Sequence, residues 1–193
     1  KKNKKFYLKN ISKNFEGKAN NQNILIAYIC NKLLKLPEKN FTKVVKNFKN
    51  LPYRASVIFE NKKLKIINNS KSTNINSTIN SINDYNNIYL ILGGISKEIH
   101  FEILSDYKEK INCVYVFGKS ALFIEKKISK SLNVKRFKNL KLLIKQVFED
   151  IKNDNFKSNI LFAPACTSYD QYKNFEDRGN DFNKLVHLSL SNL

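Results

Sequence analysis

Three short segments combine hydroxyl, amide and lysine side chains, the groups best suited to bind an anion. They read Asn69-Ser70-Lys71-Ser72-Thr73-Asn74, Gly93-Gly94-Ile95-Ser96-Lys97 and Pro164-Ala165-Cys166-Thr167-Ser168-Tyr169-Asp170. Ammonium groups and hydroxyls form charge-assisted hydrogen bonds with carboxylates and phosphates. Each segment also precedes a predicted helix, whose N-terminal amides favour anions. The residue types therefore predict an anionic ligand.

Each segment taken alone also has a purely structural explanation. Asparagine and hydroxyl side chains cap helices, glycines form turns, and lysines occur throughout this chain. Cys166 is interpreted as a small packed turn residue rather than a nucleophile, because no histidine lies near it in the sequence. His100 and His187 are expected on helix surfaces.

Short apolar runs end directly before these three segments. The runs at 56–60, 64–67, 88–92, 113–117 and 160–163 predict strands, the first two as a hairpin, and the segments at 75–82, 101–107, 121–128, 140–151 and 175–188 predict helices. Nearly continuous apolar strands are typical of a parallel sheet covered on both faces. The alternation predicts an α/β, Rossmann-like, doubly wound domain with a mostly parallel sheet, whose ligands bind at the carboxyl ends of the strands.

A helical part precedes this domain. Residues 21–36 have helical apolar spacing, with Asn20 as the expected N-cap and Pro37 ending the helix. A second helix is predicted for residues 38–48. Leu51-Pro52 then breaks the pattern, so a boundary is expected between residues 50 and 51.

The composition is strongly basic. The formal charge is +19, from 35 basic and 16 acidic side chains among 193 residues. Such a charge can serve nucleic-acid binding, because lysines neutralise phosphates. The lysines, however, lie in every segment, and arginine occurs only at positions 54, 136 and 178, which favours compositional bias. A basic nucleic-acid-binding module stays open as an alternative.

The cysteines and the hydropathy pattern bear on the compartment. The three cysteines are widely spaced and form no C-x-x-C pair, so neither a disulfide framework nor a zinc site is predicted. No segment approaches the ~18 apolar residues of a transmembrane helix, and the amino-terminal residues lack the apolar stretch of a signal peptide. A cytoplasmic location is expected.

Residues 164–179 resemble the signature of a known enzyme family. They read P-A-C-T-S-Y-D-Q-Y-K-N-F-E-D-R-G, similar to the P-A-C-A-S-x-D-x-F-x-N-F-x-x-R-G pattern of the Mur-type ATP-dependent amide ligases that add D-glutamate in peptidoglycan synthesis. Residues 51–54 (L-P-Y-R) and 68–74 (N-N-S-K-S-T-N) resemble that family's L-P-H-R and N-D-S-K-A-T-N segments. Residues 17–23 (G-K-A-N-N-Q-N) resemble its G-x-H-N-x-x-N segment. The resemblance covers essentially the whole chain.

The resemblance implies two regions and an amino-acid site. Residues 1–50 would be the end of the family's central, ATP-binding domain, and residues 51–193 its carboxy-terminal domain. Family members hold the carboxylates of the added amino acid with a lysine and hydroxyls. The implied D-glutamate-binding residues are Thr73, Lys97, Ser168, Tyr169 through its amide, and Phe175 as a wall of the pocket. Lys71 is the implied catalytic residue, beside the transferred phosphate.

The resemblance also implies a nucleotide side with two departures. Asn20 and Asn23 match positions that face adenine, while Arg54 and Asn69 match positions near the ribose and phosphates. Asn69 stands where the family has aspartate, and Ala19 where it has histidine. These changes remove one negative charge and one ring from the nucleotide side, and the lost carboxylate is expected to weaken contacts with the ribose or with magnesium.

The implied activity needs more than these residues. In the family, ATP phosphorylates the carboxylate of UDP-N-acetylmuramoyl-L-alanine, and the D-glutamate amine then displaces phosphate to form an amide. ATP and Mg²⁺ are the implied cofactors, with no metal ligand expected within this chain, and a monomer is expected. The sequence contains no G-x-x-x-x-G-K-[ST] loop for the ATP phosphates, so we expect an incomplete enzyme. Another Mur or folylpolyglutamate-type ligase is the alternative, although P-A-C-x-S favours D-glutamate.

Overall fold

The computed structural model describes residues 18–48, 51–97, 99–152 and 154–191, with side chains from residue 21 onward. The chain divides into two compact units, Lys1–Leu51 and Pro52–Leu193. Each unit is described by itself below.

The first unit contains a helix pair, α1 (Lys18–Leu33) and α2 (Glu38–Asn47). Ile24, Phe41 and Val45 form its small core, and Tyr28 packs edge-on against Phe41 with ring centroids 5.3 Å apart.

The limits of α1 differ from those predicted. The helix already begins at Lys18, so Asn20 lies inside its first turn and the predicted N-cap at this position is wrong. Lysine and alanine are good helix formers, which lets the helix extend through positions 18 and 19. It also ends at Leu33, before Pro37, which instead directly precedes α2.

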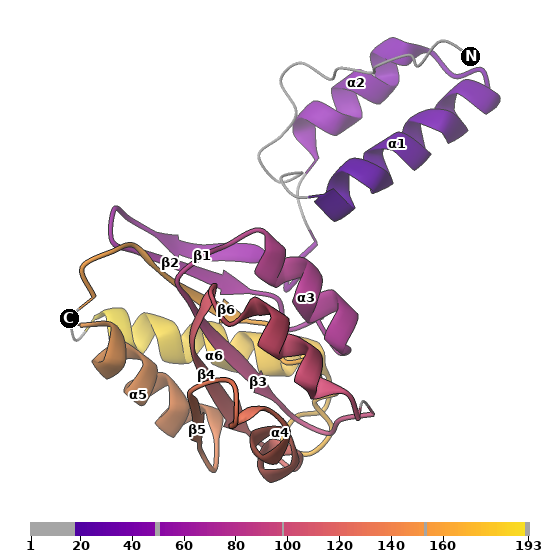
Figure 1. The fold of residues 1–193 in the computed structure, drawn as a ribbon. Helices are drawn as coiled ribbons and strands as arrows, with labels where there is room; N and C mark the ends of the chain where they lie inside the picture. Colours follow the sequence, from indigo (N-terminus) through magenta and orange to yellow (C-terminus); the bar gives the residue numbers. More distant parts are fainter. Residues whose placement is uncertain (1–17, 49–50, 98, 153, 192–193) are drawn as a thin grey trace. The chain divides into compact units, whose positions relative to one another are not determined.

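The second unit is built on a six-stranded sheet of order β1-β2-β6-β3-β4-β5 (Figure 1). The strands are β1 (Ser56–Glu60), β2 (Leu64–Asn68), β3 (Ile88–Gly93), β4 (Ile111–Phe117), β5 (Val134–Arg136) and β6 (Ser158–Phe162). Only β1 is antiparallel to its neighbour, and the other pairs are parallel. The predicted α/β class with a mostly parallel sheet is confirmed.

Helices cover both faces of this sheet, as a doubly wound fold requires (Figure 1). The helical segments are α3 (Ile75–Asn83), η2 (Phe101–Tyr107), α4 (Ala121–Ile128), α5 (Leu140–Ile151) and α6 (Phe175–Leu190). The first three share one apolar core with the sheet, and α5 and α6 share the other. The segment η2 is a 3-10 helix, which suits its two buried side chains, Phe101 and Leu104, spaced three residues apart.

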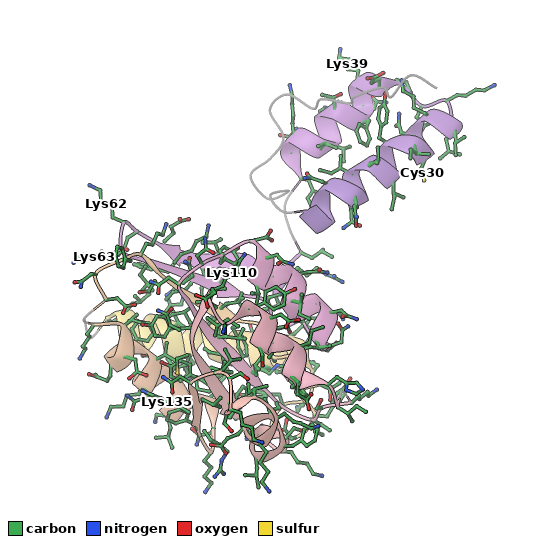
Figure 2. All side chains as sticks on the ribbon, in the orientation of Figure 1. Cys30, Lys39, Lys62, Lys63, Lys110 and Lys135 are labelled. Atoms are coloured by element: carbon green, nitrogen blue, oxygen red, sulfur yellow. The ribbon has the colours of Figure 1, made fainter. Side chains whose placement is uncertain are left out.

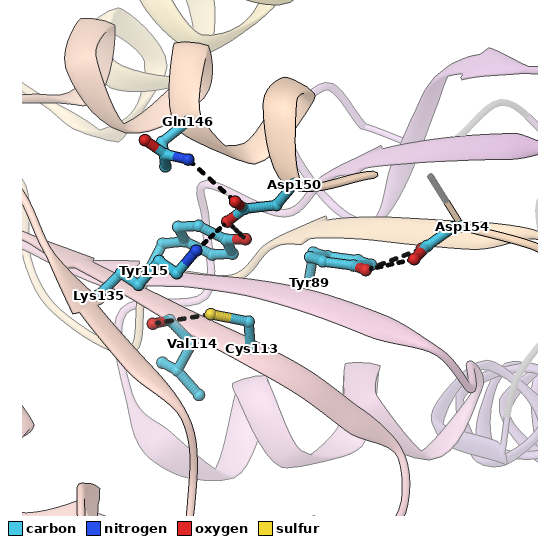
Figure 3. A network of polar contacts seen from close by, with 8 residues as sticks. All are labelled: Tyr89, Cys113, Val114, Tyr115, Lys135, Gln146, Asp150 and Asp154. Carbon is cyan, nitrogen blue, oxygen red and sulfur yellow. Dashed lines mark hydrogen bonds and ion pairs between the residues drawn. The ribbon is translucent and has the colours of Figure 1, made fainter. Parts of the chain in front are cut away.

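A polar network lies between α5 and the edge of the sheet (Figure 3). The Asp150 carboxylate accepts hydrogen bonds from Tyr115, Lys135 and Gln146. Burial alone would raise the pKa of Asp150, but these three donors outweigh it and lower the pKa. The Tyr89 hydroxyl similarly donates to both oxygens of Asp154, at 2.9 and 2.8 Å. These bonds attach α5 and the residues after it to the strands.

The buried tyrosines predict a loss of stability at alkaline pH. Burial raises the pKa of Tyr89 to about 12, and it also raises the pKa values of Tyr115 and Tyr172 above the ordinary 10.0. The unfolded chain therefore loses these protons first, so the contribution to stability is complete below about pH 10 and is lost as the pH rises through the folded pKa values. Each group can steepen the decline by up to about 1.4 kcal/mol per pH unit.

We expect Tyr89→Phe to flatten this alkaline decline. The measurement is the free energy of unfolding in urea at several pH values from about 9 to 11.5. Tyr107→Phe is the matched control, because the Tyr107 hydroxyl has no hydrogen bond within the described part of the chain. Equal slopes for the wild-type chain and Tyr89→Phe would contradict the predicted linkage.

Candidate functional site

The three segments singled out in the sequence follow three neighbouring strands. One follows β2, one follows β3, and one follows β6, which lies between them and is parallel to both. All three loops therefore leave the same edge of the sheet, at the carboxyl ends of the strands. This is where doubly wound folds bind their ligands.

Arg178 of α6 connects all three loops. Its side chain is fully buried and donates to the backbone oxygens of Ser70 (2.8 Å), Gly93 (3.2 Å) and Cys166 (3.0 Å), and to the Ser70 hydroxyl (3.1 Å). Burial lowers the pKa of Arg178 to about 10, so the guanidinium stays charged at neutral pH. The bonds fix the start of each loop relative to the others.

Lys71 and Phe175 lie together at this edge. The Lys71 ammonium is 3.9 Å from the centroid of the Phe175 ring, a cation–π distance. Ser70 donates to the backbone oxygen of Phe175 at 2.8 Å, and the Tyr53 ring packs edge-on against Phe175. The loop after β2 is therefore held against the start of α6.

The β3 and β6 loops are also joined directly. Ile95 and Thr167 exchange backbone hydrogen bonds of 2.9 and 3.0 Å, and the Thr167 hydroxyl donates to the Ile95 oxygen. Gly94, with φ of 129°, makes this approach possible, since a Cβ there would lie 2.0 Å from the Thr167 oxygen. Lys97 lies just beyond this bridge in the β3 loop, and Ser168 lies just beyond it in the β6 loop.

Besides Phe175, four residues are predicted to contact the amino acid, and they differ in exposure. Lys97 and Tyr169 are exposed, Thr73 is half-buried, and Ser168 is 3% exposed. Within the described residues, the side chains of these four make no hydrogen bond. The Lys97 ammonium and the hydroxyls of the other three residues are therefore not used in side-chain bonds among the described residues.

Asn69 has a different environment. Its side chain is buried, donates to the Ser81 hydroxyl at 2.7 Å and accepts from the Ala55 amide at 3.3 Å. Ser81 in turn donates to the Ser77 oxygen. An aspartate at this position could keep the Ala55 bond, but Ser81 would have to redirect its proton away from Ser77. The amide is therefore matched to its surroundings.

The remaining residues singled out in the sequence lie in both units. Arg54 is exposed in the second unit, Asn23 is exposed on α1, and the side chain of Asn20 lies outside the described residues. Ser72, which replaces an alanine of the family pattern, is buried and shares a 2.8 Å hydrogen bond with Thr78.

The role of Arg178 was missed in the sequence, where the residue was only part of the matched signature. Its partners are mostly backbone oxygens, and these leave no sequence pattern. One signal was available, because Arg178 is one of only three arginines among 35 basic residues. A scarce arginine in a lysine-rich chain indicates a position where the planar guanidinium is needed.

The described residues contain neither a candidate metal site nor a candidate transmembrane helix. Among them, no group of three or more histidine, cysteine, aspartate or glutamate side chains could hold a metal ion. None of the helices in the same residues is long and apolar enough to cross a membrane.

Comparison with known proteins finds homologues that match most of this chain. The chain is 35% identical over 175 residues to the UDP-N-acetylmuramoylalanine–D-glutamate ligase of Rickettsia felis, covering 90% of this chain and 39% of the relative. The same ligase of Prochlorococcus marinus is 33% identical over 180 residues, covering 91% of this chain and 38% of the relative. The chain is a homologue of these Mur ligases over about 90% of its length. It spans about two fifths of the length of these relatives.

A solved structure of another Mur ligase has the same fold. The UDP-N-acetylmuramate-alanine ligase MurC of Thermotoga maritima matches 90% of this chain and 39% of its own, with a TM-score of 0.63 and 13% sequence identity. At this identity the similarity supports the fold alone. No family model matches the sequence.

Proposed function

We propose that this chain is the carboxy-terminal, amino-acid-binding part of an ATP-dependent ligase that joins D-glutamate to UDP-N-acetylmuramoyl-L-alanine. The observation that carries the proposal is the P-A-C-T-S-Y-D loop, which resembles the D-glutamate-adding members and lies beside the Lys97 loop at the ligand-binding edge of the sheet. The identity to two D-glutamate ligases supports the same substrate.

The chemistry assigned to this chain is recognition and orientation. Lys97 and Thr73 bind one carboxylate of D-glutamate, while the Ser168 hydroxyl and the Tyr169 amide bind the other. Phe175 forms a wall of the pocket and orients Lys71 through the 3.9 Å ring contact. Lys71 faces the phosphate that leaves when the D-glutamate amine attacks the acyl phosphate. Holding the D-glutamate amine beside the carbonyl carbon of the acyl phosphate accounts for most of the expected rate acceleration.

The nucleotide side is assigned to Asn20, Asn23, Arg54 and Asn69. Asn20 and Asn23 of the first unit suit the donor and acceptor pattern of an adenine edge, and Arg54 and Asn69 of the second unit are assigned to the ribose and phosphates. Mg²⁺ would accompany ATP, but the described residues include no cluster that fits it as a resident metal. None of the steps assigned above depends on the metal. The cysteine pattern supports a cytoplasmic location.

We expect the 193 residues by themselves to form no amide from ATP, D-glutamate and the UDP-linked acceptor, because they contain no phosphate-binding G-x-x-x-x-G-K-[ST] loop. Joining them to the rest of the Rickettsia felis ligase should give an enzyme that releases one phosphate per amide formed. Phosphate release and product mass measure both outcomes. Turnover by the unjoined chain would overturn the assignment of a partial enzyme.

Asn69→Asp in the joined enzyme tests the nucleotide side. Restoring the family carboxylate should lower the KM for ATP about fivefold, the effect of roughly one additional polar contact. The KM for D-glutamate should not change. An unchanged KM for ATP would mean that Asn69 has only the structural role given by its bonds to Ala55 and Ser81.

The high net charge favours a second candidate, a nucleic-acid-binding module, but the distribution of lysines argues against it. Figure 2 labels Lys62 and Lys63 beside β1 and β2, and Lys110 and Lys135 at other elements of the same unit. Lys110 bonds the Asn83 oxygen, and Lys135 pairs with Asp150. Dispersed lysines supply counterion release without base readout, so binding should be weak and independent of sequence. A tight, salt-resistant complex with one sequence would reverse this choice.

A further inference from the structure

The loop after β4, residues 118–120, contacts both loops that carry the proposed D-glutamate ligands. Ser120 accepts a hydrogen bond from the Ser96 amide at 2.9 Å through its hydroxyl. Asp170 accepts one from the Lys119 amide at 2.8 Å through its carboxylate. Ser96 directly precedes Lys97, and Asp170 lies two residues after Ser168. The β4 loop therefore connects to each segment just beyond the Ile95–Thr167 bridge.

The geometry of this loop is specialised for these contacts. Ser120 occupies the N-cap position of α4, where a serine hydroxyl ordinarily accepts from the helix's own amides, yet it forms no such bond. Its hydroxyl is used on Ser96 instead, and its amide donates to the Gly94 oxygen at 2.9 Å. Gly118 has φ of 79°, and a Cβ there would lie 2.4 Å from the Asp170 carboxylate. Only glycine permits this close approach without strain.

We propose that Ser120 and Asp170 are positioning residues that set the separation between Lys97 and Ser168, and so select an amino acid whose two carboxylates are a glutamate's length apart. The inference rests on the proposed function. Neither residue is assigned a substrate contact. Each bond attaches one of the two segments to the same short loop, just beyond the Ile95–Thr167 bridge. Shifting either segment changes the distance between the two carboxylate-binding groups.

The test is an NMR titration of the 193-residue chain with D-glutamate, the shorter D-aspartate and the longer D-2-aminoadipate. The wild-type chain should bind D-glutamate most tightly. Ser120→Ala and Asp170→Ala should each weaken D-glutamate binding about tenfold, the effect of about one hydrogen bond. They should weaken the other two compounds less than about threefold, so the preference for glutamate declines. Ser120→Thr and Asp170→Asn keep an acceptor oxygen and should retain the preference.

Ser189→Ala is the matched control, because it removes a serine hydroxyl bond at the distant end of α6 and should leave the preference unchanged. A purely structural role for Ser120 and Asp170 would weaken all three compounds equally, and this result would overturn the proposal. Unchanged selectivity in the alanine variants, with normal binding by the wild-type chain, would overturn it while leaving the proposed function intact. A wild-type chain that binds none of the three compounds would overturn both.

Discussion

Replacing Arg178 with methionine should destabilise the second unit by about 4 kcal/mol or more, among the largest effects expected of one substitution. The variant removes the hydrogen bonds that Arg178 donates to the buried backbone oxygens of Ser70, Gly93 and Cys166. Each buried unpaired polar group costs about 1–3 kcal/mol. Methionine fills a similar volume, so the loss reports mainly on these bonds. Urea unfolding measures it.

Two further variants separate the guanidinium's geometry from its charge. Arg178→Lys keeps the charge, but one ammonium cannot reach acceptors in three loops, so a loss of about 2 kcal/mol is expected. Arg136→Met is the matched control, since the Arg136 side chain is half-exposed and paired with Glu125 at the surface. Arg136→Met should lower the free energy of unfolding by less than about 1 kcal/mol. Similar losses for Arg136→Met and Arg178→Met would disprove the connecting role of Arg178.

Replacing Lys97 with alanine in the joined enzyme should raise the KM for D-glutamate about 30-fold or more. The ammonium is assigned to a substrate carboxylate, and a hydrogen bond to a charged group contributes about 1.5–3 kcal/mol. The KM for ATP should change less than about twofold, because Lys97 is assigned no nucleotide contact. Steady-state kinetics with each substrate varied in turn measures both constants.

The control for Lys97 is Lys108→Ala, an exposed lysine at the end of η2. It should leave both constants unchanged, which excludes a general effect of removing one positive charge. Thermal unfolding should show equal stability for the two variants, since Lys97 makes no hydrogen bond within the described residues. Equal losses for ATP and D-glutamate would remove Lys97 from the amino-acid site.

Much of the fold follows from apolar patterning. The predicted limits of α4 and α5 are those of the structure, because both helices present a regular apolar face to a buried sheet. Strand β5 was missed, since Val134–Arg136 has only three residues, none of them fully buried, and no apolar run. The helix η2 was predicted by its spacing, but its 3-10 geometry was not.

The candidate site was predictable only in part. Lys71, Lys97 and Ser168 could be placed at one edge because each follows a parallel strand. The connections made by Arg178 could not be predicted, because its acceptors lie 12 to 108 residues away and are mostly backbone oxygens. The same holds for Ser120, whose hydroxyl accepts from the Ser96 amide, 24 residues away in the sequence. Sequence rules for caps, turns and periodicity do not predict contacts that depend on the order of the strands in the sheet.

The most direct test of the proposed activity is a competition assay with the joined enzyme. Equal concentrations of D-glutamate, L-glutamate, D-aspartate, L-alanine and L-lysine are supplied together with ATP and UDP-N-acetylmuramoyl-L-alanine, and the products are identified by mass. The proposed function predicts one dominant product, the D-glutamate amide, formed with one phosphate released per molecule. A dominant product carrying any other amino acid would contradict the D-glutamate assignment, and ATP hydrolysis without an amide would contradict the ligase activity.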